Sequence, residues 1–314
     1  MISVIGCGYW GKNIIKTLSK NGSLYSVHDL NEDIQKKFSN NYSLKNISLE
    51  KMLADKNVNG VMIATNANTH YEVAMQCLEN GKDIFIEKPI CLSLSEAENL
   101  GLFSKRKGLI LMVGHLLQYH DHFLTLKDLI SKGSYGPIKR IRSSRKSFGI
   151  IREHEDVIWS FAPHDISMIL SLCTDKCPSN LKLIRSKYFN RNTDRAFINF
   201  SLGDIDVELD LDWASSEKEQ KIEVYCENGV IIFEDSNLNL KEKLYVIDEI
   251  FSKENLTTKS QSKKMYINVE SNGTPLENEC RCFHESIKTR LNPYTDYIEA
   301  SRVLELLLNL EKIG

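Results

Sequence analysis

The stretch Met1-Ile-Ser-Val-Ile-Gly-Cys-Gly-Tyr-Trp-Gly11 decides the fold of this chain. Residues 2–5 are mostly apolar and β-branched, which is typical of a buried strand in a parallel sheet. Gly6, Gly8 and Gly11 follow with the spacing G-x-G-x-x-G. The first glycine permits a tight turn, the second lets backbone approach a pyrophosphate, and the third lets the next helix pack closely. The stretch therefore predicts a strand, a glycine turn and a helix N-terminus that binds a dinucleotide.

An acidic residue stands where this pattern requires one. Residues 23–29 predict a second strand, and Asp29 lies at its end. Its carboxylate would accept hydrogen bonds from ribose hydroxyls and repel a 2′-phosphate, so we expect NAD as the cofactor rather than NADP. The alternative is that Asp29 caps the helix predicted from Asn31; the two roles are compatible, with either residue as the cap.

Composition and charge indicate a globular protein of about two domains. The chain has 314 residues, a formal net charge of −2, 42% hydrophobic and 26% charged residues. It has no basic block and no apolar run of membrane-spanning length, so we expect neither a nucleic acid nor a membrane as partner. Because the first strand begins at Ile2, with no room for a signal peptide, we expect a cytoplasmic protein. We expect its eight cysteines to be free thiols, and their spacings predict no metal site.

Two patterns of secondary structure divide the chain. Up to residue 118, predicted helices alternate with strands at 60–64, 83–86 and 109–113, which predicts a doubly wound parallel sheet. From residue 119, strand-like runs follow one another with few helices between them, which predicts a mostly antiparallel sheet. We therefore expect an α/β fold with an N-terminal dinucleotide-binding domain over residues 1–118 and a C-terminal α+β domain over residues 119–314.

A lysine follows the strand predicted at 83–86, within Glu87-Lys88-Pro89. Ligands bind at this edge of open parallel sheets, so Lys88 would lie near the nicotinamide end of a cofactor. Its ammonium can donate a hydrogen bond to a substrate oxygen, and desolvation would perturb its pKa. The alternative is a surface salt bridge at the strand end.

The stretch Trp159-Ser-Phe-Ala-Pro-His-Asp-Ile-Ser-Met168 contains a second candidate for proton transfer. Pro163 suits the first turn of a helix, which would place His164 and Asp165 at the helix N-terminus. There the helix dipole disfavours imidazolium, so a neutral His164 would remove a hydroxyl proton while hydride leaves the same carbon. The alternative is a histidine that only caps the helix.

Basic residues recur along the strand predicted at 138–147. Arg140 and Arg142 would share one face of that strand, where they could meet a diphosphate or a uronate. The alternative is a charged face that is simply solvated.

Together these motifs resemble the Gfo/Idh/MocA oxidoreductase family over nearly the whole chain. The matching stretches are residues 6–11, residues 64–70, residues 87–89, Gly114-His115 and the helix of His164. The resemblance implies an N-terminal Rossmann domain, a C-terminal open sheet that supports homodimers or homotetramers, and hydride transfer at a ring carbon of a sugar or polyol. It places Lys88 and His164 near the reacting hydroxyl. The residues expected to bind the cofactor are Gly6, Gly8, Tyr9, Trp10, Gly11, Asp29, Thr65, Asn66, His70, Glu87 and Lys88.

One position departs from the family's pattern. The family often carries an aspartate four residues before the histidine, and here that position is Ser160, which cannot act as a carboxylate. A branch resembling bacterial nucleotide-sugar dehydrogenases has this form, with stretches similar to residues 114–119. The resemblance implies oxidation at C3 of a UDP-N-acetylhexosamine or its uronic acid, on the way to surface polysaccharide. The residues expected to contact the substrate are Lys88, Tyr119, Arg142, His164 and Asp165.

Two other functions stay open. Reductases of ketosugars, imines or dihydrodiols share this fold, and the fold alone does not decide between the directions. Ser160 also permits a catalytically weak protein that binds NAD or a nucleotide sugar as a sensor. Sugar oxidation that depends on Lys88 and His164 would distinguish the dehydrogenase from both.

Overall fold

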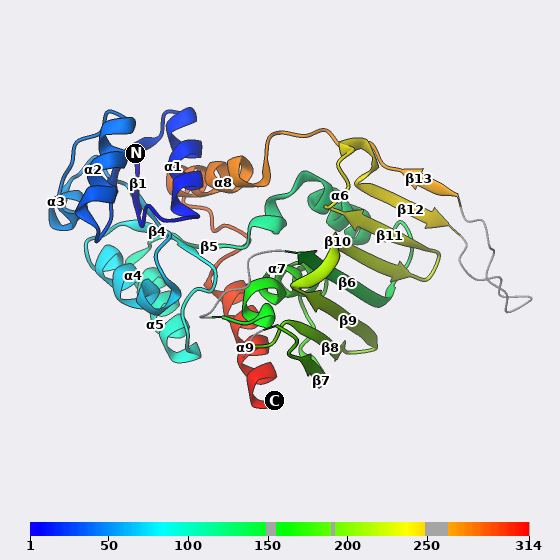
Figure 1. Cartoon of the computed structure of the whole chain (residues 1–314). Helices are drawn as coiled ribbons and strands as arrows, with labels where there is room; N and C mark the ends of the chain where they lie inside the picture. The colour runs from blue at the N-terminus through cyan, green and yellow to red at the C-terminus, as the bar shows by residue number, and fades with distance from the viewer. Residues whose placement is uncertain (149–154, 190–191, 249–262, 314) are drawn as a thin grey trace, which may run out of the picture. The chain divides into compact units, whose positions relative to one another are not determined.

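The computed structural model describes residues 1–148, 155–189, 192–248 and 263–313, which form two compact units (Figure 1). Unit 1 contains Met1–Tyr119 and Gly273–Glu305, and unit 2 contains His120–Asn272 and Leu306–Gly314. The chain thus leaves unit 1 beside residue 119 and returns to it at Gly273. The sequence predicts residues 119–314 as one second domain, because a return to an earlier unit leaves no local signal.

Unit 1 is built on a parallel sheet with the order β2-β1-β3-β4-β5 in the described part of the chain. The strands are β1 (Ile2–Ile5), β2 (Leu24–His28), β3 (Gly60–Ile63), β4 (Asp83–Glu87) and β5 (Leu111–Gly114). The strand order runs outward from β1 in both directions, which is the doubly wound topology with a switch point between β1 and β3. The predicted parallel sheet is confirmed.

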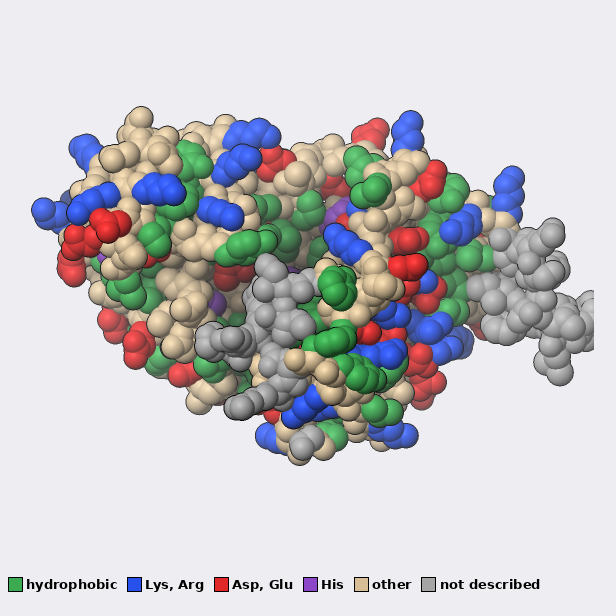
Figure 2. Space-filling view, viewed as in Figure 1, with side chains coloured by type: hydrophobic (Ala, Val, Ile, Leu, Met, Phe, Trp, Pro, Cys, Tyr) green, Lys and Arg blue, Asp and Glu red, His purple; other side chains and the backbone are tan. Residues whose placement is uncertain are grey.

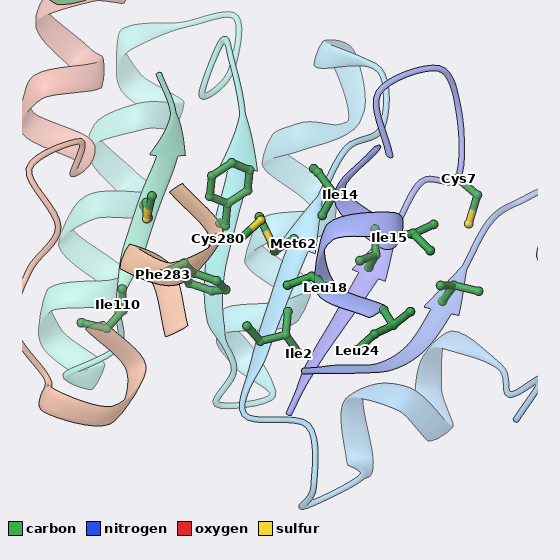
Figure 3. Packing of buried hydrophobic residues seen from close by; sticks show 14 of the residues in the cluster. Ile2, Cys7, Ile14, Ile15, Leu18, Leu24, Met62, Ile110, Cys280 and Phe283 are labelled. Carbon is green, nitrogen blue, oxygen red and sulfur yellow. The ribbon is translucent and has the colours of Figure 1, made fainter. Parts of the chain in front are cut away.

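The helices of unit 1 cover this sheet and complete its core. They are α1 (Gly11–Lys20), α2 (Glu32–Asn41), α3 (Leu49–Ala54), α4 (His70–Glu79), α5 (Leu94–Lys107) and α8 (Pro275–Thr289), with short 3₁₀ turns η1 (Ala67–Thr69) and η2 (Leu116–Tyr119). Figure 3 shows Ile14 and Leu18 of α1 in one cluster with Cys280 and Phe283 of α8. Each large apolar side chain buried there stabilises the unit by about 1.5–3 kcal/mol.

The surroundings of Gly60 show how closely α8 packs on the sheet. A Cβ added to Gly60 of β3 would lie 2.5 Å from Cδ1 of Ile287 on α8. The start of α8 is fixed by a capping box, in which Thr274 and Glu277 exchange side-chain and backbone hydrogen bonds. Residues far apart in the sequence therefore share the core of unit 1.

Unit 2 contains the larger sheet, with the order β13-β12-β11-β10-β6-β9-β8-β7 among the described strands. Its strands are β6 (Ile138–Phe148), β7 (Pro178–Ser186), β8 (Arg195–Leu202), β9 (Ile205–Asp212), β10 (Ala214–Cys226), β11 (Gly229–Glu234), β12 (Leu244–Asp248) and β13 (Lys264–Tyr266). The β6–β9 pair is parallel, and the other described pairs are antiparallel. The predicted fold class is confirmed, although β12 and β13 were not predicted.

The two faces of the unit 2 sheet differ in character. The helices α6 (Asp121–Ser131) and α7 (Val157–Leu172) pack on one face, where β9 buries Val207, Leu209 and Leu211. Alternate residues of the strands form ion pairs on the opposite face, and Figure 2 shows acidic and basic side chains intermixed over this region. The last helix, α9 (Tyr297–Ile313), contributes to both units. Within the described ranges, none of the helices combines the length and apolar character needed to span a membrane.

Candidate active site

The glycine turn has the geometry that the sequence predicted. Gly6 has a φ of +94°, and a Cβ there would lie 2.6 Å from the carbonyl oxygen of Ala64. A Cβ on Gly11 would lie 1.9 Å from the carbonyl oxygen of Gly6. A Cβ on Gly8 would meet nothing within 4 Å. The first and third glycines are therefore required by packing, whereas the second leaves open backbone that suits a pyrophosphate.

Asp29 is fixed beside this turn at the carboxyl end of β2. Its Oδ2 accepts a hydrogen bond from the Cys7 N–H at 2.8 Å, and its Oδ1 accepts one from the Asn31 N–H at 2.9 Å. Asn31 is the residue that caps α2, since its side chain accepts from two backbone N–H groups. Burial, with the charge of Asp29, raises the pKa of the Cys7 thiol to about 12, so this cysteine stays protonated.

The two aromatic residues of the turn have different surroundings. Tyr9 is exposed, with the Lys12 ammonium 4.6 Å from its ring centre. Trp10 is half-buried, and its indole N–H donates to Oε1 of Glu87. The loop after β1 is thereby connected to the end of β4.

Three expected cofactor residues follow β3. His70 is 1% exposed, and its ring nitrogens lie 2.7 Å from the Pro89 carbonyl oxygen and 3.1 Å from that of Thr65. Burial lowers the pKa of His70 despite these two contacts. The ring ties the loops after β3 and β4 together, while Thr65 is half-buried and Asn66 is exposed.

Glu87 and Lys88 stand at the carboxyl end of β4. Oε2 of Glu87 accepts a hydrogen bond from the Lys88 backbone N–H at 3.3 Å. Burial raises the pKa of Glu87 to about 7, against the opposing influence of the Lys88 charge and the Trp10 hydrogen bond. A carboxyl group that changes charge near neutrality thus lies beside the candidate catalytic lysine.

Glu279 is a buried acid of unit 1 that was not predicted from the sequence. Glu279 of α8 is 0% exposed, and neither of its carboxylate oxygens has a hydrogen-bond partner among the described residues. Burial and the charge of Glu87 raise the pKa of Glu279 well above its usual value, which favours its uncharged form. Its position on the same helix face as Leu276, Cys280 and Phe283 was a signal that could have identified it.

A buried histidine follows β5. His115 is 3% exposed, and its Nε2 lies 3.6 Å from Oε2 of Glu299. The other oxygen of Glu299 accepts a hydrogen bond from Nε2 of Gln118 at 2.7 Å. The sequence identified Gly114-His115 only as a match to the family and assigned the histidine no role.

Tyr119 does not lie on an accessible surface of unit 1. It is 1% exposed, and its hydroxyl lies 2.7 Å from Oγ1 of Thr295. Its carbonyl oxygen also accepts a hydrogen bond from Nδ2 of Asn278. The structure thus gives Tyr119 a place in this core, and its contact with substrate stays a prediction.

The prediction that His164 lies at a helix N-terminus is wrong. α7 begins at Val157, after Asp156, whose carboxylate accepts from the backbone N–H groups of Ile158 and Trp159 at 3.0 Å each. Pro163 lies inside the helix. A proline there removes one backbone hydrogen bond but does not necessarily end the helix. The helix dipole falls off within the first turn, so it does not act on His164, which is half-buried.

Asp165 joins α7 to the sheet. It is 1% exposed and accepts hydrogen bonds from Ser143 Oγ at 2.7 Å, Arg145 Nε at 2.6 Å and Arg145 Nη2 at 3.1 Å. All of its partners lie on β6. The structure thus gives Asp165 a buried ion pair within unit 2, and its contact with substrate stays a prediction.

Arg142 lies on the opposite, charged face of the sheet. Its guanidinium is 3.3 Å from Glu208 and 3.8 Å from Glu223, and its side chain is about half exposed. Arg140 also pairs with Glu208, at 2.6 Å. The two arginines share a face, as predicted, and that face neutralises much of their charge.

Comparison with known proteins identifies relatives of this chain. Residues 1–115 match the model of the Gfo/Idh/MocA family, described as an oxidoreductase family with an NAD-binding Rossmann fold. The scyllo-inositol 2-dehydrogenase (NADP(+)) of Bacillus subtilis is 32% identical over 111 residues, which are 35% of this chain and 30% of that protein. The myo-inositol 2-dehydrogenase of Thermotoga maritima is 24% identical over 176 residues, 53% of each protein. The chain spans between about a quarter and a half of the length of the curated relatives it matches.

Solved structures share the fold over almost the whole chain. UDP-N-acetylglucosamine 3-dehydrogenase GnnA from Acidithiobacillus ferrooxidans superposes with a TM-score of 0.87 at 20% identity, covering 99% of this chain and 96% of that one. KijD10, a 3-ketoreductase from Actinomadura kijaniata determined with TDP-benzene and NADP, gives a TM-score of 0.80 at 14% identity, with coverages of 99% and 96%. At these identities the likeness shows a common fold.

Proposed function

We propose that the chain belongs to the Gfo/Idh/MocA oxidoreductases, whose model matches residues 1–115, and that it is an NAD-dependent dehydrogenase of a nucleotide sugar. The observation that carries the proposal is the position of Lys88. This lysine lies at the carboxyl edge of the same parallel sheet whose first turn has the dinucleotide geometry. The edge can therefore present an ammonium group to a substrate oxygen near a bound cofactor.

The residues present fit a dinucleotide. Gly8 offers open backbone ahead of α1, and Asp29 presents a fixed carboxylate at the end of the neighbouring strand. This carboxylate supports NAD over NADP, because a 2′-phosphate beside it would be repelled. When bound, the nicotinamide supplies the hydride acceptor for alcohol oxidation.

The side chains of this chain would then position the alcohol and manage its proton. Lys88 would donate a hydrogen bond to the reacting oxygen, and Glu87 would support the lysine through its nearby carboxyl group. His164 would accept the hydroxyl proton. This role rests on the family resemblance. Ser160 stands where the family often has an aspartate and cannot share the role as a carboxylate.

Two relatives support a nucleotide sugar as the substrate class. GnnA is named as acting on UDP-N-acetylglucosamine, and KijD10 was solved with a TDP compound. We therefore propose C3 oxidation of a UDP-N-acetylhexosamine or its uronic acid, in the synthesis of surface polysaccharide. The proposal includes a homodimer or homotetramer formed through the unit 2 sheet.

The test is reduction of NAD by the purified protein, given a panel of UDP-hexosamines, their uronic acids and free inositols. Turnover restricted to one nucleotide sugar, lost in Lys88→Ala and kept in Lys107→Ala, would support the proposal. Lys107 is a matched control because it is an exposed lysine in the last turn of α5. Turnover of inositols alone would show that the substrate is a free polyol and not a nucleotide sugar.

A second arm of the panel distinguishes the competing functions. Oxidation of NADH by ketosugars, without the reverse reaction, would favour a reductase. NAD binding without turnover in either direction would favour a sensor and would make Ser160 the first residue to replace with aspartate.

A further inference from the structure

Lys88 and His115 leave the unit 1 sheet side by side. β4 and β5 are parallel neighbours, and Glu87 pairs with Gly114 in their register. The next residue of each strand is Lys88 and His115, respectively, so both emerge at the carboxyl edge. A Cβ on Gly114 would lie 2.9 Å from the Phe85 ring and 3.0 Å from Glu87 Oε2, which shows how closely these strand ends pack.

One nitrogen of the His115 ring has an acidic neighbour. The His115 side chain is 2% exposed, and its Nε2 faces Glu299 Oε2 at 3.6 Å. Gln118 holds the other oxygen of this carboxylate from η2. A proton on Nε2 is therefore favoured by the negative charge beside it.

The other ring nitrogen has no such neighbour. Nδ1 of His115 is buried and has no hydrogen-bond partner among the described residues. A buried polar atom left without a hydrogen bond destabilises a fold, so such atoms call for a functional explanation.

Burial and the charge of Lys88 keep the His115 ring neutral. The titratable groups that act on the ring are Glu299 from α9, 3.6 Å from Nε2, and Lys88 after β4. Burial, followed by the positive charge of Lys88, lowers the pKa of His115 to about 3. At neutral pH the ring therefore carries one proton, and with that proton on Nε2 the Nδ1 lone pair is available as an acceptor.

We propose that His115 is a positioning residue for Lys88. The ammonium of this flexible side chain would reach Nδ1 by a change of rotamer and donate to it a hydrogen bond that the structure does not contain, while Glu299 fixes the ring from the other side. The inference deepens the proposed function and rests on it only in assigning Lys88 to the substrate. It explains why a buried histidine with an open nitrogen follows the strand next to the lysine.

A direct test is ¹⁵N NMR of protein labelled at histidine, which reports protonation and tautomer without any turnover. The His115 signals would be assigned by their loss in His115→Asn. We expect a neutral ring protonated at Nε2 from mildly acidic to alkaline pH, and an Nδ1 signal that moves toward that of an unbonded lone pair in Lys88→Met. An imidazolium, a proton on Nδ1, or an Nδ1 signal unchanged in Lys88→Met would overturn the proposal.

Turnover supplies the second test through two replacements of the ring. The amide oxygen of His115→Asn can accept near the position of Nδ1, whereas His115→Leu offers no acceptor. We expect kcat to fall about tenfold to a hundredfold in the leucine variant, as when a group that orients a metal ligand is removed, and to stay near the wild-type value in the asparagine variant. The KM for NAD should be unchanged in both, and the limb of the pH–rate profile that depends on Lys88 should move only in the leucine variant.

The control for these variants is His284→Asn on α8, another histidine of unit 1. Thermal denaturation identifies any variant that loses kcat through unfolding. Equal loss, or no loss, in folded leucine and asparagine variants would contradict the proposal. If the wild-type protein oxidises no sugar, the proposed function fails, and the NMR result alone decides whether His115 holds Lys88.

Discussion

Removing the carboxylate of Asp165 should destabilise unit 2 without weakening substrate binding. The carboxylate accepts three hydrogen bonds from Ser143 and Arg145, and the Asp165 and Arg145 side chains are 1% and 7% exposed. Asp165→Asn keeps the size of the side chain but leaves the buried guanidinium without its counter-charge. The perturbation therefore tests whether a residue next to His164 binds substrate or holds α7 on the sheet.

The magnitude follows from this burial. Breaking a buried ion pair by removing one partner costs about 3–5 kcal/mol, because an uncompensated charge stays behind. In a domain of 150–250 residues, 1 kcal/mol shifts the melting temperature by about 2–4 °C. The expected fall for Asp165→Asn is therefore about 6–20 °C.

Thermal and urea denaturation would measure this loss, and sugar kinetics would be recorded on the protein that remains folded. The matched control is Asp128→Asn, which removes an exposed i,i+4 pair with Lys132 on α6 and should change stability by less than about 1 kcal/mol. The double variant Asp165→Leu with Arg145→Met should recover most of the stability, since it leaves no unpaired charge. An Asp165→Asn protein with unchanged stability and a strongly raised KM for the sugar would refute the reasoning and restore the substrate contact.

Three further predictions concern unit 1. The pKa of Glu87 is raised to about 7 from an ordinary 4.5, so between these pH values the folded protein retains a proton that the unfolded chain releases. The free energy of unfolding should therefore fall as pH rises from 4.5 to 7. Urea titrations should show a smaller fall in Glu87→Gln. Gly11→Ala should destabilise the turn, because its Cβ would lie 1.9 Å from the Gly6 carbonyl oxygen, whereas Gly8→Ala should lower NAD affinity in calorimetry with little change in melting temperature. Asp29→Ser should reduce the preference for NAD over NADP, and unchanged kcat/KM ratios for the two cofactors would contradict that assignment.

The N-terminal half could be predicted well because its chemistry constrains consecutive residues. A strand that turns into a helix around a pyrophosphate needs glycines at fixed spacings, and the structure shows the reasons at Gly6 and Gly11. Elements with clear caps were also predicted closely. The helix predicted from Asn31 is α2, and Asn31 is one of the two caps that the sequence offered for it.

The start of α7 shows where a local rule misled the prediction. Proline favours the first turn of a helix, but Asp156 is a better N-cap and begins the helix six residues before Pro163. Hydrophobic residues from Val157 onward pack on the sheet, and this burial outweighs the hydrogen bond lost at the proline. Tertiary packing therefore decided the position of His164 along its helix, which the sequence pattern alone could not show.

The buried residues that were not predicted from the sequence share another property. Each depends on contacts between segments that are far apart along the chain. Glu279 reaches the neighbourhood of Glu87 from α8, and Glu299 reaches His115 from α9, both through the return of residues 273–305 to unit 1. No local pattern in the sequence indicates such a return. Glu279 nevertheless interrupts an apolar helix face, and an acid placed where packing calls for a hydrophobic side chain is a departure that natural sequences tend to keep at functional sites. Buried polar residues on otherwise apolar faces are therefore the positions from which distant site residues can best be predicted.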